Sequence, residues 1–166
     1  MKKIWFTTTI TLFFLICSNG IQAQTTQTEL NQVELMKQLL GSWKCDTGKG
    51  IPSIHEAKSF GTGLECFNIR IIKDSVIQEV KQLWGYNKEN DKYFGAQMGK
   101  GMGLELYVMW FISNTKYKIV PYDDLSNPEK ARLKMEGEFK SPDIFVETIM
   151  WDNETISTGT FTRVKE

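Results

Sequence analysis

From Ser42 onward, apolar and polar residues alternate in short runs that are interrupted by glycine, asparagine and aspartate. Alternation with a period of two is typical of β-strands with one dry face, and the interruptions are typical of hairpin turns. In the clearest run, Leu133, Met135 and Phe139 share one face and charged residues occupy the other. We expect ten strands, over Trp43–Thr47, Ile54–Phe60, Leu64–Ile72, Val76–Tyr86, Tyr93–Met98, Leu104–Ile112, Tyr117–Tyr122, Ala131–Phe139, Ile144–Trp151 and Ile156–Val164.

A short helix is expected before the strands. Thr26 and Glu29 have the spacing of a capping box, and Gly41 is a natural helix end. The apolar stripe of this helix consists of Leu30, Val33, Met36 and Leu40, at spacings of three and four. Because the strands are evenly spaced and leave no room for crossover helices, the sequence predicts an all-β fold. We expect an antiparallel up-and-down β-barrel of about eight to ten strands, closed so that its edges are covered.

Two of the expected strands depart from simple alternation. One has apolar residues on both faces, and the other has amide side chains among the apolar residues of one face. In Leu104–Ile112 we assign Leu106 and Trp110 to the lumen, so that the opposite face needs cover from the N-terminal helix or a second copy of the chain. In Val76–Tyr86, Gln78 and Gln82 share a face with Val80, Trp84 and Tyr86. Buried amides need hydrogen-bond partners, for which a ligand or ordered water is the candidate.

The first 23 residues have the pattern of an export signal. Lys2 and Lys3 precede the apolar run Ile4–Cys17, which is too short to span a bilayer, and Ala23 is placed just before a cleavage site. The remaining residues, 24–166, are expected to form one domain that is periplasmic or secreted. The alternative is a lipid anchor at Cys17. No later stretch has the pattern of a membrane span.

Charge and cysteine content restrict the chemistry further. The chain has 20 basic and 20 acidic residues, and two of the basic ones lie in the leader. Nucleic acid is therefore not expected as the partner, because phosphate binding needs a basic face. Cys45 and Cys66 either form a disulfide, as an oxidising compartment allows, or serve as two small buried hydrophobes. We expect no metal site and no cofactor, since two cysteines and one histidine are too few for a zinc site of soft ligands.

The segment Gly41-Ser42-Trp43 after a short helix resembles the opening of lipocalins and their relatives in the calycin group. The hairpin over residues 83–87 is similar to that of several bacterial families of lipocalin-like secreted proteins. The resemblance implies that Trp43 closes one end of the barrel and that an arginine from the last strand, here Arg163, packs over its ring. It also implies a ligand in the lumen, although the later lipocalin signature segments and the closing motif of fatty-acid-binding proteins have no counterpart here.

Three charged or titratable residues have alternative interpretations. Arg163 either has only the structural role beside Trp43 or reaches an anionic ligand. His55 is the only histidine, and it either lines the cavity with a functional role or is structural. Arg70 either points inward and pairs with Glu147, which would indicate a polar ligand head group, or both charges face solvent.

Together with the resemblance, these patterns predict binding of a small hydrophobic or amphipathic molecule. The expected lining residues are His55, Gln78, Val80, Gln82, Trp84, Tyr86, Leu106, Trp110, Leu133, Met135 and Phe139. One alternative is an interaction or structural protein of the cell envelope with a filled barrel, with a homodimer as one form. The other is an isomerase-type enzyme that uses the lumen, with His55 or an inward carboxylate as acid–base group. No catalytic set can be assembled from the sequence.

Overall fold

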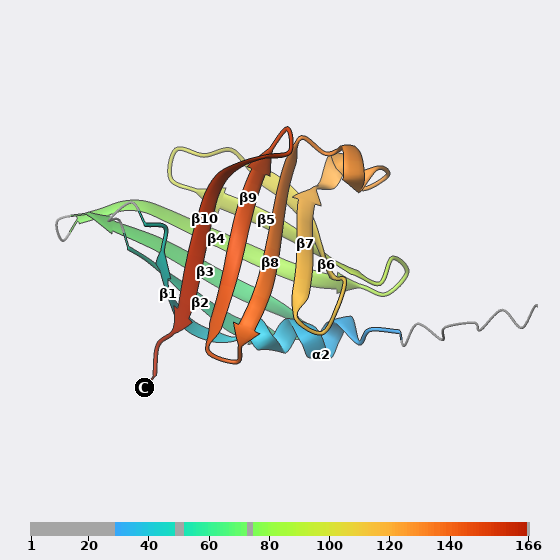
Figure 1. Ribbon diagram of the computed structural model, residues 1–166, viewed down its shortest axis with the longest axis horizontal. Helices are drawn as coiled ribbons and strands as arrows, with labels where there is room; N and C mark the ends of the chain where they lie inside the picture. The colour runs from blue at the N-terminus through green and yellow to red at the C-terminus, as the bar shows by residue number, and fades with distance from the viewer. Residues whose placement is uncertain (1–28, 49–51, 73–74, 166) are drawn as a thin grey trace, which may run out of the picture.

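A closed barrel of ten antiparallel strands forms the body of the protein (Figure 1). The computed structural model describes residues 29–48, 52–72 and 75–165. The expected all-β fold with a short N-terminal helix is confirmed. The strands are β1 Gly41–Asp46, β2 Ser53–Phe60, β3 Gly63–Ile72, β4 Ser75–Asn87, β5 Lys92–Gly99, β6 Glu105–Phe111, β7 Lys116–Pro121, β8 Leu133–Ser141, β9 Ile144–Trp151 and β10 Glu154–Arg163.

Pairing between the first and last strands closes the barrel. Successive strands pair as hairpins, and β1 then pairs with β10 so that Trp43 lies opposite Arg163. Each described strand therefore has a neighbour on both sides, which leaves no sheet edge open to association. The link between β7 and β8 holds two 3-10 turns, η3 Tyr122–Asp124 and η4 Pro128–Lys130.

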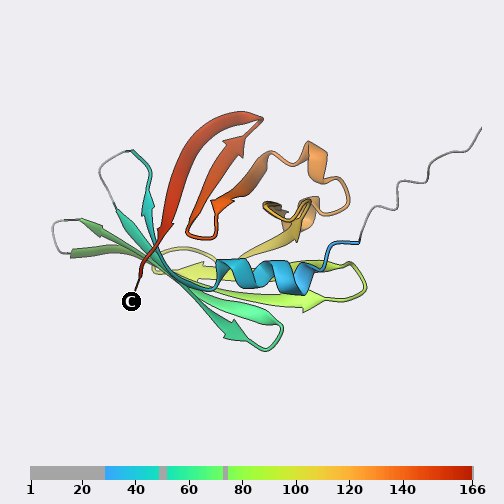
Figure 2. The same ribbon diagram turned by 60° about the horizontal axis from the view of Figure 1, so that its bottom comes forward.

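The helix lies across one end of the barrel (Figure 2). It consists of α2 Gln32–Met36 and the 3-10 turn η2 Lys37–Leu39. Asn31 caps α2, because its Oδ1 accepts a hydrogen bond of 3.1 Å from the amide of Glu34. The expected cap residue Thr26 lies outside the described residues. Met36 and Leu39 are buried and close this end of the barrel, which we call the floor.

Gln32 anchors the helix to β6. Its Oε1 accepts from the Phe111 amide at 2.7 Å, and its Nε2 donates to the Phe111 carbonyl at 3.0 Å. The pairing of β6 with β5 ends at Met109. The backbone amide and carbonyl of Phe111 would otherwise lack hydrogen-bond partners, and the buried Gln32 side chain supplies both.

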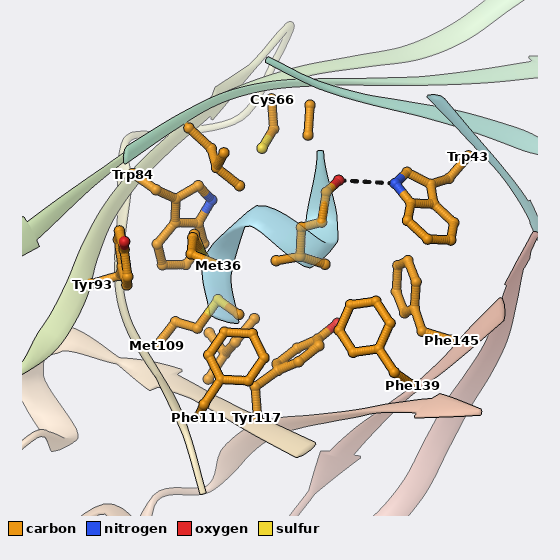
Figure 3. Close-up of a cluster of buried hydrophobic side chains, with 14 residues drawn as sticks. Met36, Trp43, Cys66, Trp84, Tyr93, Met109, Phe111, Tyr117, Phe139 and Phe145 are labelled. Atoms are coloured by element: carbon orange, nitrogen blue, oxygen red, sulfur yellow. Dashed lines mark hydrogen bonds between the residues drawn. The ribbon is translucent and has the colours of Figure 1, made fainter. Parts of the chain in front are cut away.

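Above the helix, aromatic rings fill the floor of the barrel (Figure 3). Trp43, Tyr93, Tyr117 and Phe111 are among its most completely buried side chains. Edge-on contacts join the Trp43 ring to Phe145, at 4.8 Å between ring centroids. These rings, together with Met36 and Leu39 of the helix, make up an apolar floor.

Arg163 lies over the Trp43 ring, as the resemblance implies. Its guanidinium carbon is 4.0 Å from the ring centroid, and its Nη atoms donate to the carbonyls of Leu40 and Gln38. Gly41 has a φ of +107°, and a Cβ there would approach the Arg163 guanidinium to 2.8 Å. Glycine at this position thus permits both the backbone turn and the close passage of the arginine.

The prediction of which β6 residues face the lumen is wrong. Leu106 and Trp110 lie on the outer face, and Tyr107 and Met109 face the lumen instead. Both faces of this strand are apolar, so hydrophobicity alone could not decide between them. The outer face is partly covered by η3 from the β7–β8 link, where Tyr122 packs against Phe94 of β5 at 5.7 Å between ring centroids. Neither of the two expected covers, the helix or a second copy, is needed for this contact.

Cys45 and Cys66 are both free and buried. The disulfide alternative is wrong for this structure because β2 lies between β1 and β3, which carry the two cysteines. Strands two positions apart are separated by about 10 Å, whereas a disulfide needs Cα atoms within about 7 Å. Burial raises the pKa of the Cys66 thiol to about 12. The two residues therefore act as small apolar side chains.

The predicted export signal over residues 1–23, its cleavage site after Ala23 and the alternative anchor at Cys17 all lie outside the described residues. Among the residues that are described, none belongs to a helix with the length and apolar character needed to cross a membrane.

Candidate functional site

The lumen above the floor holds two adjacent chambers that share part of their lining. The inner chamber has a volume of about 120 Å³ and lies directly above the floor. The outer chamber has a volume of about 380 Å³ and extends towards the strand ends that lie away from the helix, which we call the mouth. Gln82, Met135 and Glu147 are among the residues that line both chambers. The two chambers thus adjoin inside the barrel, above the apolar floor.

Most of the predicted lining residues face this cavity. His55 and Trp84 line the inner chamber, and Gln78, Val80 and Leu133 line the outer one. Gln82 and Met135 line both.

Phe139 and Tyr86 line neither chamber, which corrects their expected placement. Phe139 is buried in the aromatic floor. Tyr86 packs on Tyr93, and its hydroxyl donates to Asp91 at 2.7 Å. With Leu106 and Trp110 on the outer face, four of the expected lining residues are outside the cavity.

Glu147 brings a carboxyl group into the interior of the barrel. The Tyr117 hydroxyl donates to its Oε2 at 2.9 Å. Burial raises the pKa of Glu147, and the hydrogen bond from Tyr117 partly opposes that effect. The pKa of Tyr117 is raised well above its usual value by burial and then by Glu147. The pair places an acid and a phenol at the boundary between the floor and the vacant cavity.

His55 faces Asn68 across the β2–β3 pair. Its Nδ1 is hydrogen-bonded to Asn68 Oδ1, and its ring meets Phe161 edge-on at 6.2 Å. Burial lowers the pKa of His55, so the imidazole is neutral at neutral pH. The histidine thus offers a neutral polar edge to the inner chamber.

A chain of side-chain hydrogen bonds supplies the partners that the lumen amides need. Trp84 Nε1 donates to Gln82 Oε1 at 3.3 Å, and Gln82 Nε2 donates to Gln97 Oε1 at 2.5 Å. Gln97 Nε2 and the Tyr107 hydroxyl then both donate to Glu105 Oε2, each at 2.9 Å. At Gln82, protein groups therefore take the place expected for a ligand or ordered water. The Gln78 amide donates separately to Met102 Sδ at 3.7 Å.

The hypothetical ion pair between Arg70 and Glu147 is not formed. Both residues line the outer chamber, but the Arg70 side chain is exposed at the mouth. Glu147 instead takes its hydrogen bond from Tyr117, and within the described ranges no ion pair joins it to Arg70. The interior carboxyl group of Glu147 is thus hydrogen-bonded to a neutral donor, the Tyr117 hydroxyl.

The sequence indicates Glu147 only as a partner for Arg70, and it does not indicate Tyr117, Asn68 or Gln97 as site residues. The signal for Glu147 is local. Glu147 interrupts the row Phe145, Glu147 and Ile149, in which the flanking residues are apolar and face the same side.

The described part of the chain holds no group of three or more histidine, cysteine or acidic residues arranged to bind a metal ion. The site is therefore characterised by its cavity and its hydrogen-bonding groups. Comparison of the chain with protein-family models gives no match, and comparison with curated proteins gives none either.

Proposed function

We propose that the protein binds a small amphipathic molecule in the two-chamber lumen. The observation that carries this proposal is a pair of adjoining cavities above an apolar floor, with apolar and polar groups side by side on their walls. Its outer chamber lies within the range of about 300–1,000 Å³ that is usual for small-molecule sites.

The binding energy would come from the apolar part of the ligand. Val80, Leu133 and Ile149 present aliphatic surface to the outer chamber, and Met135 extends this surface inward. Each CH₂ group removed from water contributes about 0.8 kcal/mol before the costs of association. Because the floor is rigidly packed, little of this energy would be spent on ordering the site.

The same proposal includes the lipocalin-like family and an exported location. The first is supported by the closed barrel and by the Trp43–Arg163 contact at its floor. The second is supported by the sequence pattern of residues 1–23 alone. In that setting the protein would carry or sequester a molecule outside the cytoplasm.

A fluorescent apolar probe tests the proposed site. We expect N-phenyl-1-naphthylamine to bind, and Met135→Trp to weaken its binding at least tenfold (about 1.4 kcal/mol), because the larger ring would fill the junction of both chambers. Glu136→Trp is the matched control, since Glu136 is the next residue in β8 and is exposed. Its affinity should stay within twofold of the parent, and circular dichroism should show both variants folded. Equal binding by parent and Met135→Trp would contradict a site in the lumen.

A second candidate is acid–base catalysis in the same cavity. The observation that favours it is the raised pKa of Glu147 beside an inner chamber that His55 also lines. Binding is better supported, because burial alone accounts for the shifts of both residues.

A further inference from the structure

The charge of the inner chamber distinguishes between classes of amphipathic ligand. Glu147 is the single Asp, Glu, Lys or Arg among the described residues that line this chamber. His55 also lines it, but burial favours the neutral imidazole. The basic side chain nearest to the ligand path is Arg70, which is at the mouth and exposed. The deepest part of the cavity therefore carries acidic character without a compensating cation.

One oxygen of Glu147 is open to the cavity. Oε2 accepts the hydrogen bond from Tyr117, and no described residue donates to Oε1. Among the described residues, no buried side-chain nitrogen or oxygen is left without a hydrogen-bond partner. Oε1 must therefore be in contact with open space, and the space beside Glu147 is the lumen. Glu147 Oε1 is therefore a hydrogen-bond acceptor that is available to a ligand in the lumen.

Aromatic rings line the same chamber as this acceptor. Tyr107, Tyr117, Phe145 and Phe161 line the inner chamber together with Glu147. The faces of such rings attract cations and repel anions, and the effect is larger where water is excluded. A carboxylate ligand in this chamber would be repelled by Glu147, whereas an ammonium group would be attracted by it.

We propose that the ligand is an amine with an apolar body, whose ammonium group binds Glu147 Oε1 in the inner chamber while its apolar body occupies the outer chamber. This inference rests on the proposed binding function and specifies its ligand class. An ammonium group beside Glu147 favours the ionised carboxyl and so opposes the effect of burial. The ion pair, with Tyr117 as a second donor to the carboxylate, repays the cost of removing the ammonium from water.

Three ligands with the same eight-carbon chain test the proposal by isothermal titration calorimetry at neutral pH: octylamine, octanol and octanoate. We expect octylamine to bind at least tenfold more tightly than octanol, and octanoate to bind most weakly. In Glu147→Gln, octylamine should fall to within twofold of octanol. Octanol itself should be nearly unchanged, which also shows that the variant is folded. Glu154→Gln removes an exposed carboxylate of β10 and should keep the full preference.

The possible failures separate the two proposals. Equal binding of all three ligands, or tightest binding of octanoate, would overturn the amine assignment and leave the proposed binding function standing. Retention of the octylamine preference in Glu147→Gln would overturn the assignment to this residue. Failure of octanol, octylamine and N-phenyl-1-naphthylamine alike to bind the parent protein would overturn both proposals.

Discussion

Replacing Trp43 by alanine is expected to lower the free energy of unfolding by about 3–5 kcal/mol, the usual range for a fully buried large aromatic residue. Trp43 is 0% exposed, and its Nε1 donates to the Leu39 carbonyl at 2.9 Å. The substitution would remove the ring on which Phe145 and Arg163 pack. It would therefore leave a cavity in the floor and a guanidinium without its aromatic partner.

Urea unfolding followed by circular dichroism measures this change without relying on tryptophan fluorescence. Trp151→Ala is the matched control, because Trp151 is 44% exposed although Arg132 lies over its ring at 4.8 Å. We expect the control to lose less than about 1 kcal/mol. A loss of that size or smaller for Trp43→Ala would contradict the role of Trp43 in closing the barrel.

Replacing Gly137 by alanine is expected to cost about 3 kcal/mol, at the upper end of the usual penalty for overpacking. Gly137 faces the lumen, and a Cβ built on it would overlap the ring of Tyr117. Gly137 is held in register with Tyr117 on one side and with Glu147 on the other, so its backbone has little freedom to yield. Tyr117 would have to move, and its hydrogen bond to Glu147 would be lost.

Gly85→Ala provides the comparison for this substitution. Gly85 is also in a strand, but a Cβ there would meet nothing within 4 Å. Its unfolding free energy should change by less than about 1 kcal/mol. If the two alanine variants unfolded at the same urea concentration, the close packing of Tyr117 on Gly137 would be contradicted.

The fold could be predicted from the sequence because its signals are local. Alternation, turn residues and the Gly41–Trp43 segment each indicate a strand, a hairpin or a strand start. Which face of a strand points into the barrel is harder to predict. In β8 the charged residues determine which side faces water, whereas in β6 Leu106 and Tyr107 give no such contrast. The two faces of β6 differ because η3 packs against one of them. This contact cannot be predicted from the residue pattern of β6 alone.

The candidate site was only partly predictable for the same reason. Gln82 could be recognised as an inward amide, but its partner Gln97 depends on the register between β4 and β5. Glu147 could be recognised as a polar residue in an apolar row. That Tyr117 rather than Arg70 serves as its partner follows from the placement of β7 and β3 around the closed barrel.

Native mass spectrometry of the protein isolated from the cells that naturally make it shows directly whether the lumen holds one small molecule. We expect one small molecule bound per chain, or one added octylamine per chain after exchange, with neither retained by Met135→Trp. A chain that shows only its own mass, and that stays bare at saturating octylamine, would contradict this expectation.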